Sequence, residues 1–169
     1  TIGRNDPLAG IDALARQVRA SGIRQVAGDV VIDDRLFITR DLGENDGPVS
    51  PIVVNNNLID LVTTPTAPGR PAAVRMRPVV APWSVENKVR TVSSQARTSI
   101  DVAADESTGV ITLTGTIAAG SAPALKVWHM SDPATFARSA FVQALERVGV
   151  RVDAPTVRTN STAGLPAQS

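Results

Sequence analysis

Few side chains in this sequence could move a proton or attack a substrate. The 169 residues include one histidine, His129, two lysines, Lys88 and Lys126, and no cysteine. A hydroxyl nucleophile needs a base within hydrogen-bond reach, and only these three side chains are candidates for that base. Ser131 and Asp132 follow the histidine closely, but a triad needs a separately placed carboxylate to orient the base. We therefore interpret Asp132 as a helix cap and predict no catalytic residue in this chain.

Other kinds of site are not indicated either. One histidine and scattered carboxylates lack the spacing of metal ligands. The glycines form no phosphate-binding loop. Asp101 and Asp105–Glu106 are typical of a solvated face and a turn rather than an acid/base pair. We expect no metal and no cofactor.

Charge and hydropathy exclude several classes of partner. The net charge is +1 and the 17 basic residues are scattered, so we expect no nucleic-acid partner. Aromatic residues make up 3% of the chain, which argues against stacking platforms for bases or sugars. The apolar runs are shorter than the ~20 residues of a membrane helix, so we predict no membrane span.

Two stretches near opposite ends of the chain follow one plan. Each begins with Asp-Pro, at Asp6–Pro7 and Asp132–Pro133, continues with apolar residues at helical spacing, and breaks at a glycine, Gly22 or Gly149. Proline suits the first helical turn, the preceding Asp accepts free N–H groups, and glycine ends helices. Each stretch therefore predicts a capped helix followed by a strand, the first strand running from Gln25 to Asp33.

The region between these helices is rich in strand signals. Val110–Ile117 alternates apolar residues with threonine, which predicts a strand with one buried face. Regular turn signals between such segments predict a small antiparallel sandwich or barrel. The other expected strands are Leu58–Val62, Ala72–Met76, Lys88–Val92 and Thr98–Ala103, with a proline-bounded edge at Val79–Pro82 and a return to the helical unit at Leu125–Met130.

These patterns together predict an α/β (α+β) accessory domain with a nested, mainly antiparallel all-β subdomain. The α/β domain comprises residues 1–46 and 125–158, the inserted β-rich subdomain comprises residues 47–124, and residues 159–169 form a linker or tail. The loop-like start and the small polar residues of the tail suggest a piece of a longer protein.

Five groups of residues follow one another along the chain in a distinctive order. These groups are Leu14–Ala15 with Gly22–Asp33 and Phe37; Pro48–Ser50 with Asn55–Ile59; Val85–Asn87 with Thr91; Leu113–Ile117; and Asp132–Pro133 with Phe141, Leu145 and Gly149–Val150. Their order resembles that of the low-molecular-mass class C penicillin-binding proteins. The chain thus resembles the serine D-Ala-D-Ala carboxypeptidases and endopeptidases of the S13 peptidase family over nearly its whole length. It departs from the family between Phe37 and Val49, where members usually place aromatic residues.

Enzymes of this kind carry three catalytic motifs, S-x-x-K, S-x-N and K-T-G, and none of them occurs here. The lysine after Ser84, Lys88, comes one position too late. The resemblance implies that this chain is the insertion between S-x-x-K and S-x-N of an enzyme of the periplasm or another extracytoplasmic compartment. Its expected role is to support the catalytic domain and shape the substrate cleft. Its implied partners are the transpeptidase-like catalytic domain of the parent chain and the peptidoglycan stem peptide.

The resemblance also implies a substrate contact. Asp33 and Phe37 match the family pattern D-x-x-x-F, and Asp33 would pair with the ammonium group of the peptide's diamino acid. The alternative is that Asp33 starts a turn and Phe37 fills the core. A different functional class also remains open, a non-enzymatic extracytoplasmic binding or adhesion module with Trp83 as its exposed anchor.

Overall fold

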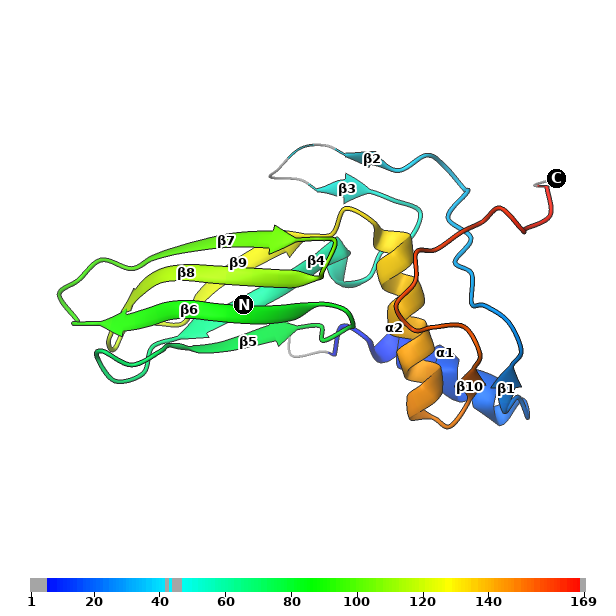
Figure 1. Ribbon diagram of the computed structural model, residues 1–169, viewed down its shortest axis with the longest axis horizontal. Helices are drawn as coiled ribbons and strands as arrows, with labels where there is room; N and C mark the ends of the chain where they lie inside the picture. The colour runs from blue at the N-terminus through cyan, green and yellow to red at the C-terminus, as the bar shows by residue number, and fades with distance from the viewer. Residues whose placement is uncertain (1–5, 42, 44–46, 168–169) are drawn as a thin grey trace. The chain divides into compact units, whose positions relative to one another are not determined.

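The computed structural model describes residues 6–41, 43 and 47–167. The chain divides into two compact units (Figure 1). Unit 1 comprises Thr1–Asn57 and His129–Ser169, and unit 2 comprises Leu58–Trp128, so unit 2 is nested in the sequence of unit 1. Unit 2 begins and ends later in the sequence than the predicted insert of residues 47–124. The expectations for residues 1–5, the loop 42–46 except Gly43, and the last two residues fall outside the described part.

The second helix of unit 1 follows the predicted plan. Helix α2, Pro133–Arg147, begins at proline, and the Asp132 side chain accepts a hydrogen bond of 2.9 Å from the N–H of Thr135. Gly149 follows the helix with φ of +77°, where a side chain would be strained.

The first helix begins later than expected. Helix α1 spans Ala9–Ala20, and the Asp6 carboxylate accepts a hydrogen bond from the N–H of Leu8 at 2.9 Å. Asp6–Pro7 therefore forms a turn before the helix, and the N-cap residue, Leu8, has no capping side chain.

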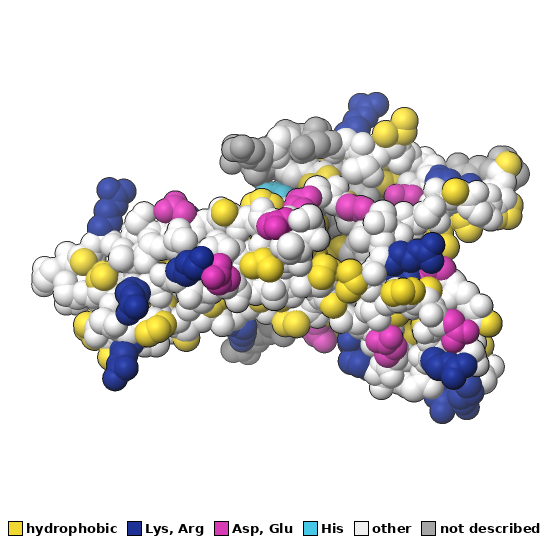
Figure 2. Space-filling view, viewed as in Figure 1, with side chains coloured by type: hydrophobic (Ala, Val, Ile, Leu, Met, Phe, Trp, Pro, Cys, Tyr) yellow, Lys and Arg dark blue, Asp and Glu magenta, His cyan; other side chains and the backbone are white. Residues whose placement is uncertain are grey.

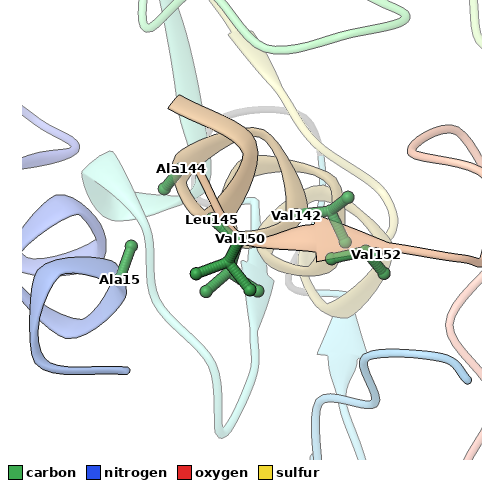
Figure 3. Packing of buried hydrophobic residues seen from close by; sticks show 6 residues of the cluster. All are labelled: Ala15, Val142, Ala144, Leu145, Val150 and Val152. Carbon is green, nitrogen blue, oxygen red and sulfur yellow. The ribbon is translucent and has the colours of Figure 1, made fainter. Parts of the chain in front are cut away.

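The two helices of unit 1 pack around a short parallel strand pair. Strand β1, Gln25–Val26, pairs with β10, Arg151–Val152, and Gln25 lies opposite Arg151. The buried cluster in Figure 3 joins α1, α2 and the region of β10; its members are Ala15, Val142, Ala144, Leu145, Val150 and Val152. Each buried Val or Leu stabilises the fold by about 1.5–3 kcal/mol relative to exposure, and this cluster joins the two sequence segments of unit 1.

The predicted strand from Gln25 to Asp33 is wrong beyond Val26. No described strand pairs with residues 27–33. The side chain of Asn160 replaces the missing strand, because its Oδ1 accepts from the N–H of Ile32 and its Nδ2 donates to the Ile32 carbonyl, both at 2.9 Å. Further along, β2, Arg40–Asp41, pairs antiparallel with β3, Pro48–Val49.

Unit 2 consists of two three-stranded sheets. One has the order β5-β4-β9, formed by Ala73–Arg77, Leu58–Thr64 and Ala124–His129, and the other has the order β6-β8-β7, formed by Ser84–Val92, Val110–Ala118 and Ser99–Asp105. Each sheet has one buried face, with Ile59 and Leu61 on β4 and Ile111 and Leu113 on β8 fully buried. These alternating buried residues make unit 2 a small sandwich, which confirms the predicted fold class of an α+β chain with a mainly antiparallel β part. The β6–β8 pair is parallel.

Three local expectations for the middle region need correction. Leu125–Met130 does not return directly to unit 1, because β9 is an edge strand of the sheet that contains β4. Val79–Pro82 forms no strand. The side chain of Trp83 is half-buried, so it is not an exposed anchor.

A left-handed turn lies where the chain leaves unit 1. The three residues of the short helix η1, Asn55–Asn57, have φ values of 51°, 54° and 57°. Asparagine tolerates this conformation better than most residues. Asn57 is buried, and its Oδ1 accepts from the N–H of Val54 at 3.1 Å. Its carbonyl accepts from the N–H of Met130 at 3.0 Å, so the outgoing and returning chains are adjacent within unit 1.

Candidate functional site

Asp33 lies in the irregular segment after β1 rather than at a strand end. Its carboxylate forms a two-pronged ion pair with Arg35, with Nε to Oδ1 and Nη2 to Oδ2 both at 2.8 Å. The backbone N–H of Arg35 also donates to Oδ1 at 3.2 Å. A carboxylate oxygen accepts about two hydrogen bonds, so Oδ1 is saturated while Oδ2 can accept another. About half of the Asp33 side chain is exposed.

The hydrogen bonds from Arg35 also set the charge of this carboxylate. The Arg35 guanidinium lowers the pKa of Asp33 from 3.8 to about 2. Asp34, next in sequence, adds a second carboxylate beside the same guanidinium. Two carboxylates and one guanidinium leave this short segment with one negative charge, which favours a cation as its ligand.

Phe37 lies on the surface of unit 1, with 45% of its area exposed. It does not fill the core, so that part of the alternative interpretation is wrong, whereas the turn that the alternative expected after Asp33 is present at residues 35–36. With Ile38, Arg40 and Val49 it lines a hollow of about 330 Å³. The pattern D-x-x-x-F therefore places an ionised carboxylate and an exposed aromatic ring four residues apart in one irregular segment.

A buried arginine fixes the start of this segment. Arg138 on α2 is fully buried, and its guanidinium forms an ion pair with Asp29 through Nε, at 2.9 Å, and Nη2. It also donates to the carbonyls of Pro155 and Thr156, both at 3.0 Å. Burial acts to raise the pKa of Asp29, but the hydrogen bonds and positive charge of Arg138 and the charge of Arg158 outweigh it, and the pKa is lowered.

The C-terminal segment is tied to the same region. Asn160 bonds both backbone groups of Ile32, and its own N–H donates to the Thr135 hydroxyl at 2.8 Å. The Arg35 guanidinium, through Nη1, donates to the Pro166 carbonyl at 2.8 Å. Residues 29, 32 and 35 are thus each held by a group from α2 or from the C-terminal segment, which positions Asp33 without a strand.

The sequence did not single out Arg35, Arg138 or Asn160. Arg138 left a usable signal, because it is a lone basic residue among the apolar positions of a predicted helix. Arg35 lies two residues from Asp33, but nothing in the pattern distinguishes it from other surface arginines. Asn160 carried no signal, since its partner Ile32 is 128 residues away.

Among the residues that the structure describes, Asp132 is not placed as the carboxylate of a triad with His129. The Asp132 carboxylate caps α2 through Thr135 rather than orienting the imidazole. A Cβ added to Gly47 would lie 2.1 Å from Nδ1 of His129, so the imidazole packs against a backbone that only glycine allows. Within the described ranges, no group of three or more His, Asp or Glu side chains could hold a metal ion.

Surface charge and helix length are consistent with these observations. On the face shown in Figure 2, basic and acidic side chains are interspersed. No helix in the described part of the chain is long and apolar enough to cross a membrane.

Comparison with known families decides the relationship. The model of the D-Ala-D-Ala carboxypeptidase 3 (S13) family matches residues 1–167. The chain belongs to this family. A D-alanyl-D-alanine carboxypeptidase from Actinomadura sp. (strain R39) is 29% identical over 170 residues, covering 89% of this chain and 32% of the relative. The chain therefore spans about a third of the length of that curated relative.

Solved structures share the fold. Penicillin-binding protein 4 from Haemophilus influenzae matches with a TM-score of 0.62 and 17% identity, over 84% of this chain and 35% of that chain. A structure of the same protein in complex with a β-lactam matches with a TM-score of 0.57 and 17% identity, over 86% and 33% of the two chains. At this identity the match establishes the fold, and the family assignment rests on the sequence match.

Proposed function

We propose that this chain is the non-catalytic accessory part of an extracytoplasmic serine D-Ala-D-Ala carboxypeptidase, which it supports and whose substrate cleft it shapes. One observation carries the proposal: the S13 family model spans residues 1–167, yet the sequence contains none of S-x-x-K, S-x-N and K-T-G. The nucleophile and its lysine then belong to the catalytic domain of the parent chain. That domain and the peptidoglycan stem peptide are the partners of this chain.

Asp33 and Phe37 are the proposed substrate contacts. The free acceptor site on Oδ2 of Asp33 receives the ammonium group of the diamino acid in the stem peptide, and the net negative charge of Asp33–Arg35 attracts it. The exposed ring of Phe37 offers an apolar surface to the aliphatic part of that side chain. Arg35 keeps Asp33 ionised and oriented before the peptide arrives.

The absence of a nucleophile is tested with a fluorescent penicillin. The isolated chain should form no covalent adduct, whereas the parent protein, labelled in parallel, should form one. A labelled band from the isolated chain would contradict the proposal. The proposed localisation is tested on the parent by fractionating cells, where it should be found outside the cytoplasm.

The substrate contact is tested by Asp33→Asn in the parent. The variant keeps the size of the side chain but loses the charge, so kcat/KM for a peptide bearing the diamino acid should fall by about 10-fold. Acylation by a simple penicillin without that amine should be unchanged. Asp101→Asn, at an exposed position on β7, is the matched control. Equal losses on both substrates would mean that Asp33 only supports the fold.

A further inference from the structure

The surface around β2 and β3 exposes large apolar side chains side by side in the sequence. Leu36 and Ile38 are 80% and 85% exposed, and Val53 is 62% exposed. We call Leu36, Phe37, Ile38, Val49 and Val53 the apolar strip. Neither unit 1's buried cluster nor the residues packed against it include any member of the strip.

Exposed apolar residues elsewhere do not gather in this way. Twelve large hydrophobic side chains are exposed in the described part of the chain, and the strip supplies five of them from a stretch of only 18 residues. Leu125 and Val127 form a pair on β9, and the others, such as Leu14, Val79 and Val157, are spread along the sequence. Single exposed apolar residues are ordinary, whereas a clustered set marks an interaction surface.

The strip also contains a hollow and borders a positively charged side chain. The hollow of about 330 Å³ lies between Phe37, Ile38, Arg40 and Val49, so it can accept an apolar side chain from a partner. The Arg40 side chain is exposed and takes part in none of the ion pairs found among the described residues. A partner surface that is complementary to the strip is therefore apolar and carries a carboxylate that can pair with the Arg40 guanidinium.

We propose that the apolar strip docks on the catalytic domain of the same parent chain. Two observations select this occupant. The curated carboxypeptidase relative is about three times as long as this chain, and the proposed function assigns the remaining length to a catalytic domain. The strip begins three residues after Asp33. This step rests on the proposed function: if Asp33 borders the substrate cleft, Leu36 lies close to the catalytic domain that forms the cleft.

The docking fixes the position of Asp33 in the cleft. The short Asp33–Leu36 connection cannot move far once Leu36 and Ile38 are covered, and Arg35 between them holds the carboxylate. The strip therefore carries no chemistry, and its residues act as positioning residues for the substrate contact.

Hydrogen exchange tests the docking in the full parent protein. Amides of residues 36–38 and 49–53 should exchange at least 10-fold more slowly in the parent than in the isolated chain, because the catalytic domain covers them. Amides next to Val79 and Val157 should exchange equally in both. Equal exchange of the strip in both proteins would overturn the proposal. Protection that grows with protein concentration would also overturn it, because the occupant would then be a second copy.

Paired variants in the parent separate the docking from the substrate contact. Leu36→Ser with Ile38→Ser should remove the protection of residues 49–53 and raise KM for the diamino-acid peptide about 10-fold, while acylation by a simple penicillin persists. Val79→Ser with Val157→Ser, which replaces two exposed valines elsewhere, should change neither. Asp33→Asn should raise KM without changing the protection. If Asp33→Asn has no effect while the strip stays protected, the proposed substrate contact fails and the docking stands.

Discussion

The two units of this chain are stabilised in different ways. Unit 2 relies on long backbone ladders, and β6 and β8 pair from Ser84 with Val110 to Val92 with Ala118. Unit 1 has strand pairs of only two residues each. Ion pairs tie its segments together instead, among them Arg138–Asp29, Arg147–Asp12 and Arg35–Asp33. Unit 1 thus fixes irregular segments with specific side chains, which lets it present Asp33, but it depends on those individual side chains.

Deleting unit 2 is the strongest way to test this difference. Joining Asn57 to His129 through a short glycine linker is possible because the Asn57 carbonyl and the Met130 N–H are already 3.0 Å apart. We expect unit 1 to keep its helical circular dichroism and its own thermal transition, and the signal of the β sandwich to disappear. Loss of the helical signal would mean that unit 1 needs unit 2 to fold, and the predicted domain organisation would be wrong.

Replacing Arg138 should cause the largest effect of a single substitution. Arg138→Ala removes the buried guanidinium that donates to Asp29 and to the carbonyls of Pro155 and Thr156, and leaves Asp29 with the Val30 N–H and Arg158. Removing one partner of a buried ion pair costs about 3–5 kcal/mol. Arg90→Ala is the matched control in unit 2, where an exposed guanidinium donates to the Gly69 carbonyl at 3.1 Å, and it should cost about 0–1 kcal/mol.

Urea unfolding, followed separately by helical circular dichroism and by tryptophan fluorescence, measures both variants. Trp83 and Trp128 both belong to unit 2, so the fluorescence follows that unit. Arg138→Ala should lower the urea concentration at the midpoint of the transition seen by helical circular dichroism. The midpoint seen by tryptophan fluorescence should stay the same. A joint shift of the two transitions would show that the units unfold together.

A smaller effect is expected at the start of α2. Asp132→Ala removes the acceptor for the Thr135 N–H, and loss of an N-cap costs about 1 kcal/mol. Asp6→Ala should cost less, because the Asp6 carboxylate serves the turn before α1 rather than the helix itself. Thermal unfolding of the two variants under the same conditions checks the ranking, and equal costs would contradict the different start of the two helices.

The smallest expected effect is the loss of stability at low pH when the Asp33 carboxylate is protonated. The pKa of Asp33 is about 2 in the folded chain, below its usual 3.8. A lowered folded pKa adds stability that is present above the unfolded pKa and is lost as pH falls through the folded one. The contribution of the Asp33–Arg35 pair should therefore disappear between about pH 4 and pH 2. NMR titration of the Asp33 carboxyl should give a midpoint near 2, and Arg35→Gln should raise it. An unchanged midpoint in the variant would exclude Arg35 as the cause.

What the sequence could predict depended on how local the interaction was. Val110–Ile117 became β8 and Asp132–Pro133 became the start of α2, because alternation and capping act within a few residues. The S13 family was also predicted from the order of the five groups of residues, and the family match confirms it. The strand expected through Asp33 failed, because the groups that hold this segment, Asn160 and Arg138, lie more than 100 residues away.

The parallel pair of β1 and β10 has a consequence for how the protein is made. Gln25 cannot meet Arg151 until the ribosome has added all of unit 2, whereas β6, β7 and β8 are contiguous and can pair as soon as they emerge. Local pairings form faster than pairings that close a long loop. The nested unit should therefore complete its sandwich first, while α1 waits with an uncovered apolar face for α2 to be synthesised. During that interval the nascent chain is most exposed to aggregation and to chaperone binding.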